Sequence, residues 1–459
     1  MKEWAGRRVT ILGLARQGTA LVRYLVREGA DVTVSDLRDA DALRETLALL
    51  KDVPVRYVLG EHPPSILDDA DLLCLSGGVP ADAPIVAQAR QRGIALSNDA
   101  QVFLERCPAQ VVGITGSSGK TTTTTLVSRM LQQSGFMTWV GGNIGRPLVD
   151  RLGEIRENDR VVIELSSFQL ELMTASPGVA AVLNVTPNHL DRHKTMPAYT
   201  AAKRRILDSQ VEGDLALLGH DDAGSRELAP AVRGRLAFFS MRGEVPGDMG
   251  AFLRDEVITL RLDGQEHSVC HSGEIKLLGR HNVLNVLAAC ALAGGVGAPV
   301  EAMRQVATSF TGVAHRLQLV RSLGGVRYYD DSMATAPERT VAALHAFDAP
   351  VVLLAGGRDK ALPWEDMAQV ALRRARHVVA FGEAAGLVER EIRNEKLENR
   401  NEKLEGLTRV ETLEEAVEEA ARVARPGDVV LLSPGGTSFD AFKDFAERGE
   451  RFQALVRAL

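Results

Sequence analysis

Short apolar runs alternate with amphipathic stretches from the beginning of the chain to its end. In the first hundred residues, apolar runs predict buried strands at 8–14, 31–36, 71–76 and 94–97. The stretch at 19–28 predicts a helix between the first two strands. Strands that alternate with helices are typical of parallel sheets covered by helices. We therefore expect a first α/β domain that ends near Asn98.

The alternation begins again after residue 110. Apolar runs predict further strands at 111–115, 161–164 and 181–184. An antiparallel pair is predicted at 257–262 and 267–269, because an Asp263-Gly264 turn lies between these two runs. A helix predicted at 282–292 closes this section.

The last part of the chain follows a break near Gly312 and alternates in the same way. Its apolar runs predict strands at 351–354, 377–380 and 429–432. The sequence therefore predicts three α/β domains: a Rossmann-like domain at 1–98, a central domain at 99–312 and a second Rossmann-like domain at 313–459. A length of 459 residues agrees with about three domains of ordinary size.

The composition is typical of a globular protein and argues against a protein that binds nucleic acid or spans a membrane. Hydrophobic residues make up 45% and charged residues 25%, which is ordinary for a globular protein. The net charge of −6 argues against a broad surface for nucleic acid. Because we find no signal segment and no run of about 18 apolar residues, we expect a cytoplasmic protein without a membrane span. The four cysteines lack metal-ligand spacing and are expected to be free thiols.

A direct seven-residue duplication, RNEKLENRNEKLE, occupies 393–405. Two copies are too few to sustain a coiled coil. We therefore expect the duplicated segment to form a solvated extension of a helix.

A glycine-rich loop follows the strand predicted at 111–115 and precedes a helix pattern. The segment 113–125 reads GITGSSGKTTTTT. Glycines let backbone N–H groups converge on phosphate oxygens, and the N-terminus of the helix adds positive potential. Lys120 can reach the β- and γ-phosphates of ATP, and the hydroxyl of Thr121 can hold Mg²⁺. The predicted ATP contacts in this loop are Gly116, Ser117, Ser118, Gly119, Lys120, Thr121 and Thr122.

This loop departs from the strict GxxxxGK[ST] pattern, because Ile114 occupies the first glycine position. A lone GK[ST] could also be an ordinary turn from a strand into a helix. The strand–loop–helix context favours ATP binding, so the central domain is predicted to be a P-loop mononucleotide-binding domain.

Polar residues follow the next two predicted strands. Glu164 ends the strand at 161–164, and His189 lies soon after the strand at 181–184. The carboxyl ends of parallel strands share one edge, which faces the ligand crevice. Glu164 is therefore a candidate Mg²⁺ ligand. His189 alone would more often be a structural histidine, but beside Glu164 and the phosphate loop it becomes a candidate functional residue. Lys203 follows in a helix pattern, where the local sequence alone favours a solvated basic face.

The first domain carries an incomplete dinucleotide fingerprint. The segment 13–18 reads GLARQG, which nearly matches GxGxxG but has Ala15 in the middle place. Asp36 ends the second predicted strand, where a ribose-binding acid would lie. Taken alone, these features suggest NAD binding and a dehydrogenase. No dehydrogenase chemistry is evident downstream, so pyrophosphate binding in general is the safer interpretation.

Longer segments of the chain resemble the Mur ligases. These segments are GITGSSGKTTTT in the loop, ELSSFQLE at 164–171, NVTPNHLDRH at 184–193, GRHNVLNVLAA at 279–289 and LSPGGTSFDAFKDF at 432–445. The resemblance spans all three predicted domains in matching order. Within the family, SSFQLE, YTAAK and GERF are most similar to the glutamate-adding enzyme. The resemblance implies an ATP-dependent amide ligase of peptidoglycan synthesis, and hence a role in cell-wall biogenesis, cell shape and cell division.

The implied reaction has two steps. ATP phosphorylates the carboxylate of UDP-N-acetylmuramoyl-L-alanine, and the amine of D-glutamate then attacks the acyl phosphate. By resemblance, Lys120 contacts the phosphates, while Thr121 and Glu164 share one Mg²⁺. His189 resembles the ligand of a second Mg²⁺. Lys203 matches the lysine that this family carbamylates to support the second ion.

Other residues match binding positions of the family. Positions for adenine, phosphate and ribose are matched by Asn282, Asn285, Arg316 and Asp331. Positions for the UDP-sugar are matched by Asn143, Asp36, Leu37, Arg38 and Gly78, with Arg16 and Gln17 in a loop that varies. Positions for glutamate are matched by Thr335, Lys360, Ser438 and Phe445. The cleft with the incomplete NAD fingerprint would therefore hold UDP.

The glutamate site contains one departure from the family pattern. The family often has NDSKAT where this chain has DDSMAT at 330–335, so Met333 replaces a lysine. One alternative is therefore the same chemistry with L-glutamate, or with another substrate of the Mur or folylpolyglutamate type. We expect a monomer whose third domain swings onto the second when ligands bind. A non-catalytic nucleotide-binding protein is a further alternative, against which stands the joint presence of Lys120, Glu164, His189 and Lys203.

Overall fold

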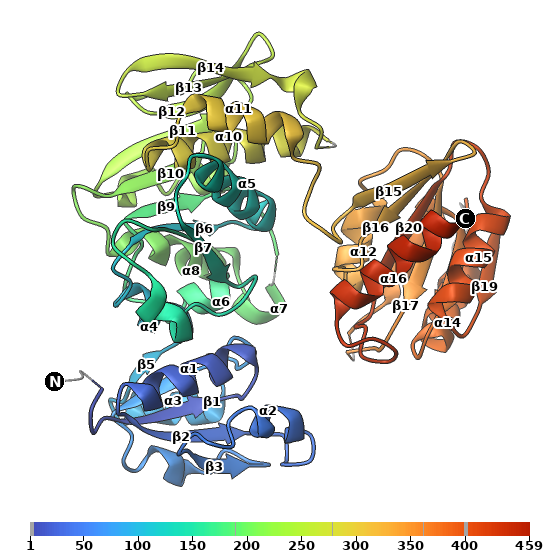
Figure 1. Ribbon diagram of the computed structural model, residues 1–459. Coiled ribbons are helices and arrows are strands. Elements are labelled where there is room, and N and C mark those ends of the chain that lie inside the picture. The colour runs from blue at the N-terminus through green and yellow to red at the C-terminus, as the bar shows by residue number, and fades with distance from the viewer. Residues whose placement is uncertain (1–3, 189, 278, 361, 399–402) are drawn as a thin grey trace. The chain divides into compact units, whose positions relative to one another are not determined.

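A computed structural model describes residues 4–188, 190–277, 279–360, 362–398 and 403–459 (Figure 1). The chain forms two compact units, which we call unit 1 (Met1–Phe310) and unit 2 (Thr311–Leu459). Unit 1 contains two sheets and unit 2 contains one. Each unit is described by itself.

The first sheet of unit 1 has parallel strands in the order β3-β2-β1-β4-β5. The strands are β1 (Arg8–Leu12), β2 (Asp31–Asp36), β3 (Arg56–Leu59), β4 (Leu72–Leu75) and β5 (Ala95–Ser97). The helices are α1 (Arg16–Arg27), α2 (Arg44–Ala48), the 3₁₀ turn η1 (Pro64–Leu67), α3 (Pro84–Gln91) and α4 (Asp99–Leu104). The strand order reverses at β1, and ligands bind beyond the carboxyl ends of strands at such a reversal.

The second sheet has the order β14-β13-β12-β11-β10-β9-β6-β8-β7 and is parallel from β7 to β12. Its strands are β6 (Gln110–Thr115), β7 (Thr138–Gly142), β8 (Arg160–Glu164), β9 (Val179–Val182), β10 (Leu215–Gly219), β11 (Arg235–Ser240), β12 (Gly250–Arg254), β13 (Val257–Leu262) and β14 (Gln265–His271). The last three form an antiparallel meander.

Helices α5 and α10 pack against each other and against strands of this sheet (Figure 1). The helices of this part are α5 (Lys120–Gln133), α6 (Ser167–Leu170), α7 (Leu190–His193), α8 (Met196–Asp208), α9 (Ala223–Arg226), α10 (Arg280–Gly295) and α11 (Val300–Ser309). Short 3₁₀ turns are η2 (Val149–Glu154), η3 (Ala229–Ala231) and η4 (Ser272–Glu274).

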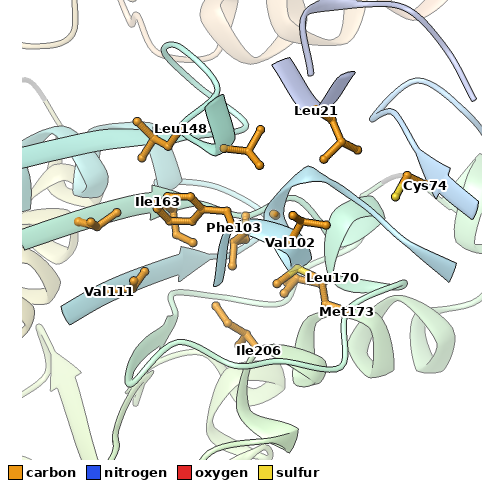
Figure 2. Close-up of a cluster of buried hydrophobic side chains, with 14 of the residues drawn as sticks. Leu21, Cys74, Val102, Phe103, Val111, Leu148, Ile163, Leu170, Met173 and Ile206 are labelled. Carbon is orange, nitrogen blue, oxygen red and sulfur yellow. The ribbon is translucent and has the colours of Figure 1, made fainter. Parts of the chain in front are cut away.

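One cluster of buried hydrophobic side chains joins the two sheets of unit 1 (Figure 2). Leu21 comes from α1 and Phe103 from α4, whereas Ile163 comes from β8 and Ile206 from α8. Because one continuous apolar core draws on both sheets, the two sheets are held together as one unit.

Unit 2 has one sheet in the order β15-β16-β20-β17-β18-β19, parallel except for β15. Its strands are β15 (Gln318–Leu323), β16 (Val326–Asp330), β17 (Val351–Gly356), β18 (Ala375–Phe381), β19 (Gly406–Arg409) and β20 (Val429–Gly435). The helices are α12 (Pro337–Leu344), α13 (Glu365–Arg374), α14 (Ala385–Glu398), α15 (Leu413–Val423) and α16 (Phe445–Ala458).

Both faces of this sheet are covered. Leu353 of β17 packs in a core with residues of α12, α13 and α14. Its neighbour Leu354 packs in a second core with residues of α15 and α16. Side chains alternate between the faces of a strand, so a continuous apolar run such as VVLL is the pattern of a strand buried on both sides.

The expected elements are present with shifted ends. The strand predicted at 8–14 ends at Leu12, because Gly13 turns the chain with a φ of 86°. The strand predicted at 257–262 has those bounds, and the helix predicted at 282–292 is longer at both ends, as α10. No helix among the described residues is long and apolar enough to cross a membrane.

The duplicated segment does not form one helical extension. Its first copy continues α14 as far as Glu398. Lys403, Leu404 and Glu405 of the second copy are not helical, and Leu404 is buried in a core of unit 2. The expectation of a solvated extension is therefore wrong for this end of the segment, because an apolar contact holds Leu404 inside.

Candidate functional site

The glycine-rich loop connects β6 to α5 at the carboxyl edge of the second sheet. Gly119 precedes the first residue of α5 with a φ of 81°, a conformation that favours glycine. A Cβ atom at this position would lie 2.3 Å from Oδ1 of Asn285 on α10. Glycine is therefore required both by the backbone and by the side chain that packs over it.

The segment after β9 holds this loop in place. The backbone N–H of Ser117 donates to the carbonyl of Asn184 (3.0 Å), and that of Ser118 donates to Oδ1 of Asn184 (2.9 Å). Oγ of Ser117 lies 3.1 Å from the hydroxyl of Tyr199 and 2.9 Å from the carbonyl of Thr186. Asn184 and Tyr199 were not among the predicted site residues, although both lie in segments that resemble the family.

Two lysines converge on one carbonyl of the loop. Nζ of Lys120 donates to the carbonyl of Gly116 (2.8 Å), and Nζ of Lys203 donates to the same oxygen (2.9 Å). Lys203 is only 1% exposed, so the solvated basic face expected from its local sequence is wrong. Burial, followed by the charge of Lys120, lowers the pKa of Lys203 to about 6. Helix α8 carries this amine into the loop.

Glu164 is fixed from both sides at the end of β8. The hydroxyl of Thr121 donates to Oε2 of Glu164 (2.7 Å), and Nδ2 of Asn143 donates to Oε1 (2.9 Å). Glu164 is 2% exposed. Thr121, a predicted metal ligand, and Asn143, a predicted UDP-sugar contact, therefore both donate to the carboxylate of Glu164 beside the phosphate loop.

The two asparagines predicted to contact ATP lie next to each other on α10. Nδ2 of Asn285 donates to Oδ1 of Asn282 (2.8 Å), and Asn285 is buried above Gly119. Thr122 is buried in the first turn of α5.

His189 lies outside the described residues. Unit 1 thus brings together Lys120, Thr121, Glu164, Asn143, Lys203, Asn282 and Asn285 around one loop.

The carboxyl edge of the first sheet holds the other predicted UDP contacts. The carboxylate of Asp36 accepts from the backbone N–H of Leu14 (2.7 Å) and from Nη2 of Arg38 (2.8 Å). Although burial opposes it, hydrogen bonds from Arg38 and Leu14 lower the pKa of Asp36 to about 2. Oε1 of Gln17 accepts from the N–H of Gly77 (3.2 Å). The remaining residues lie exposed at this edge: Arg16, Leu37 and Gly78.

Unit 2 contains the predicted glutamate contacts. Nζ of Lys360 donates to Oγ1 of Thr335 (3.2 Å). Partial burial, followed by the charge of Arg339, lowers the pKa of Lys360. Ser438 is 2% exposed, and the carbonyl of Phe445 accepts from the hydroxyl of Ser332 (2.7 Å).

A buried arginine that sequence analysis missed supports this region. Arg448 of α16 is 0% exposed. Its guanidinium donates to the carbonyls of Ser332 (2.9 Å), Gly436 (3.2 Å) and Thr437 (3.0 Å). Burial lowers the pKa of Arg448 to about 10. Arg448 therefore ties the turn after β16 to the turn after β20.

Asp331 lies in the same turn after β16. Its carboxylate accepts from the hydroxyl of Ser433 (2.8 Å) and from the N–H of Leu317 (3.2 Å). Burial raises the pKa of Asp331 to about 7, and the charge of the neighbouring Arg316 opposes this. The two predicted nucleotide contacts of unit 2, Arg316 and Asp331, are therefore close enough to interact.

Comparison with known families covers most of the chain. Residues 7–98 match the family model of the Mur ligase MurD-like N-terminal domain, 114–293 match the Mur ligase middle domain, and 315–436 match the Mur ligase glutamate ligase domain.

Relatives match over their whole length. The chain is 40% identical over 458 residues to the UDP-N-acetylmuramoylalanine--D-glutamate ligase of Acetivibrio thermocellus, covering 100% of this chain and 98% of the relative. It is 43% identical to the ligase of the same name from Symbiobacterium thermophilum, with 98% of each chain covered.

Solved structures match the fold. A murein peptide ligase from Psychrobacter arcticus has a TM-score of 0.56 at 17% identity, with 99% of each chain covered. The UDP-N-acetylmuramate-alanine ligase MurC from Thermotoga maritima has a TM-score of 0.56 at 20% identity, with 98% of this chain and 99% of that chain covered.

Proposed function

The chain belongs to the Mur ligase family, and we propose that it joins D-glutamate to UDP-N-acetylmuramoyl-L-alanine at the expense of ATP. The observation that carries this proposal is 40% identity, over 100% of the chain, to a relative with the name of that ligase. The product is a peptidoglycan precursor, so the activity would serve cell-wall synthesis.

The reaction consists of two displacements. A carboxylate oxygen of the substrate attacks the γ-phosphorus of ATP, and ADP leaves. The amine of glutamate then attacks the carbonyl carbon of the acyl phosphate, phosphate leaves, and the amine loses a proton. Little covalent work falls to the protein, so positioning and neutralisation of charge dominate.

The phosphate loop supplies these two effects. The ammonium of Lys120 lies over the carbonyl of Gly116 (2.8 Å), within the loop that would hold the phosphates. The positive end of α5 begins at the same residue. We infer that Lys120 neutralises the γ-phosphate, while backbone N–H groups from Gly116 to Thr122 orient the chain of phosphates. Asn282 and Asn285 would contact the nucleotide from α10.

Magnesium fits the oxygen atoms at the end of β8. Among the described residues, no three His, Cys, Asp or Glu side chains gather as a metal cage. Mg²⁺ commonly binds through one or two protein groups, with phosphate oxygens and waters as its other ligands. Thr121 and Glu164, whose oxygens lie 2.7 Å apart, would hold one ion of this kind. The ion would neutralise charge on the phosphates.

A second ion would need the predicted pair His189 and Lys203. The amine of Lys203 is buried beside the loop, 2.9 Å from the carbonyl of Gly116. A neutral amine can attack CO₂, losing a proton to give a carbamate with two hard oxygens. We infer that Lys203 acts in this modified form, which places an anion near Lys120 in place of a neutral amine.

The other two substrates would bind away from the phosphate loop, one in unit 1 and one in unit 2. The UDP group would lie at the carboxyl edge of the first sheet, near Asp36, Leu37, Arg38, Gly78, Arg16 and Gln17, with Asn143 nearer the reacting end. Glutamate would bind in unit 2 at Thr335, Lys360, Ser438 and Phe445, with Arg316 and Asp331 contacting the nucleotide. We infer domains at 1–98, 99–312 and 313–459 for these roles, in a cytoplasmic monomer with access to ATP.

The test is release of phosphate from ATP by the purified protein. Release should require UDP-N-acetylmuramoyl-L-alanine and D-glutamate together, and omission of either should reduce it to background. The presence of Met333 in the glutamate region makes L-glutamate the second candidate. Equal or faster turnover with L-glutamate would overturn the D-specific assignment, and mass spectrometry of the product identifies any other acceptor or amino acid.

A further inference from the structure

Glutamate poses an electrostatic problem for the pocket in unit 2. It brings two carboxylates, and a carboxylate that leaves water needs a positive partner or several hydrogen bonds. Lys360 supplies one ammonium next to the hydroxyl of Thr335. A second cation would therefore be expected near these two residues.

Arg448 is near this region but is already committed. It is 0% exposed, and its guanidinium donates to carbonyls in the turns after β16 and β20. Moving its donors to a ligand would leave those buried carbonyls without partners. We therefore assign Arg448 to the support of the pocket.

Position 333 cannot supply the cation. Met333 follows Ser332 in the turn after β16, two residues before Thr335. Its thioether is at best a weak acceptor and carries no charge to pair with a carboxylate. Its backbone N–H donates to the carbonyl of His315 (3.0 Å), which fixes the residue in the turn.

Arg339 brings a guanidinium to this same residue. It lies in the first turn of α12 and is exposed. Its Nη1 donates to the carbonyl of Met333 at 3.3 Å, a long contact that uses one nitrogen of a guanidinium with five N–H donors. Its positive charge is also near enough to Lys360 to lower the pKa of that amine. The only acid among the causes of that shift is Glu338, which opposes it.

We propose that Arg339 binds one carboxylate of the glutamate substrate while Lys360 binds the other, so that Arg339 carries the charge that Met333 lacks. This proposal rests on the proposed function. A guanidinium suits the role, because its planar fork can hold a carboxylate with two parallel hydrogen bonds. The helical geometry of α12 returns Arg339 to Met333 even though six positions separate them in the sequence.

The first test is kinetic. Arg339→Leu should raise KM for D-glutamate about 10- to 100-fold, the loss expected for hydrogen bonds to a charged group. KM for ATP and for UDP-N-acetylmuramoyl-L-alanine should stay within about twofold. Arg373→Leu is the matched control, because it removes an exposed arginine from the last turn of α13 with the same change in net charge. It should leave all three KM values unchanged.

The second test moves the cation. The double variant Met333→Lys with Arg339→Leu places an ammonium at the residue that Arg339 now contacts, and it should recover most of the loss in KM for D-glutamate. A variant that was merely misfolded would not be rescued in this way.

These outcomes separate the two proposals. An unchanged KM for D-glutamate in Arg339→Leu, an equal rise in all three KM values, or no recovery in the double variant would each overturn the role of Arg339. If the unaltered protein releases no phosphate with both substrates present, the proposed function itself fails.

Discussion

The phosphate loop of unit 1 and the glutamate region of unit 2 are both proposed to bind anions, but they are built differently. Around the loop, the functional side chains hydrogen-bond to one another or to the loop itself: Thr121 with Glu164, and both Lys120 and Lys203 with the carbonyl of Gly116. In unit 2 the deeply buried side chain is a support, Arg448, whereas the side chains that would touch the ligand, Lys360 and Arg339, reach the surface.

This difference in construction should make the phosphate loop less tolerant of substitution than the glutamate region. Around the loop, the hydroxyl of Thr121 donates to the buried carboxylate of Glu164, so removal of Thr121 takes a hydrogen bond from that carboxylate. In unit 2 a surface cation can be replaced by another cation that reaches the same point from a different position. On our proposal Arg339 of α12 supplies the charge that Met333 lacks, whereas at the loop the second lysine, Lys203, already donates to the same carbonyl as Lys120.

The largest expected effect is a loss of activity when the phosphate loop is altered. Lys120→Ala should lower kcat by at least about 100-fold, as loss of a positioned charge donor commonly does. Measurement of phosphate release at saturating substrates gives kcat directly. Lys51→Ala, an exposed lysine in unit 1, is the control and should be fully active. Full activity of Lys120→Ala would refute the assigned role of the loop.

The next effect tests the support in unit 2. Arg448→Leu should lower the free energy of unfolding of unit 2 by about 2–3 kcal/mol, because buried carbonyls lose their donor. Trp364 is buried in unit 2 and can report unfolding in urea once Trp4 and Trp139 are replaced by Phe.

The control for this experiment lies on the same helix. Arg451 is half exposed and pairs with Glu414 at 2.6 Å, so Arg451→Leu should cost less than about 1 kcal/mol. Equal losses in the two variants would mean that Arg448 is no more than another surface charge.

The most gradual effect concerns pH. Burial raises the pKa of Asp331 from 3.8 to about 7, so between these values the folded state holds a proton that the unfolded state has lost. The resulting contribution to stability is fully present below about pH 3.8 and is lost as pH rises through about 7. The slope from one group is at most about 1.4 kcal/mol per pH unit.

Asp331→Asn removes this titration. Urea unfolding of both proteins between pH 5 and pH 7.5 should give a flatter dependence for the variant than for the unaltered protein. Subtraction of the two curves removes the contribution of His315, whose pKa is raised by its hydrogen bond to Asp330. Parallel curves would show that Asp331 does not hold a proton in this window.

Sequence analysis succeeded where neighbours in space are also neighbours in the chain. The phosphate loop is contiguous, so glycines, lysine and threonine could be recognised together, and the family resemblance extended this to the ligase class. Strands with uninterrupted apolar runs, such as β17, were found, whereas others, such as β3 and β19, were not predicted.

Residues whose role depends on tertiary contacts were harder to predict. The burial of Lys203 depends on the approach of α8 to the loop, and nothing in its local sequence shows this. Asn184 and Arg448 act on turns that are distant in the sequence. The contact of Arg339 with the carbonyl of Met333 depends on the path of the chain into α12, which the local sequence does not show. The roles of the individual site residues stay predictions until the variants are measured.

The apolar cluster that joins the first two sheets has a practical meaning for chimaeric proteins. Leu21 and Phe103 belong to it together with Ile163 (Figure 2), so exchanging residues 1–98 between relatives would replace one half of a shared core and leave the other half unmatched. Exchange at the junction between Phe310 and Thr311 leaves the core of each unit intact. For grafting a different amino-acid specificity onto the phosphate-transferring part, this junction is the natural place to recombine the chain.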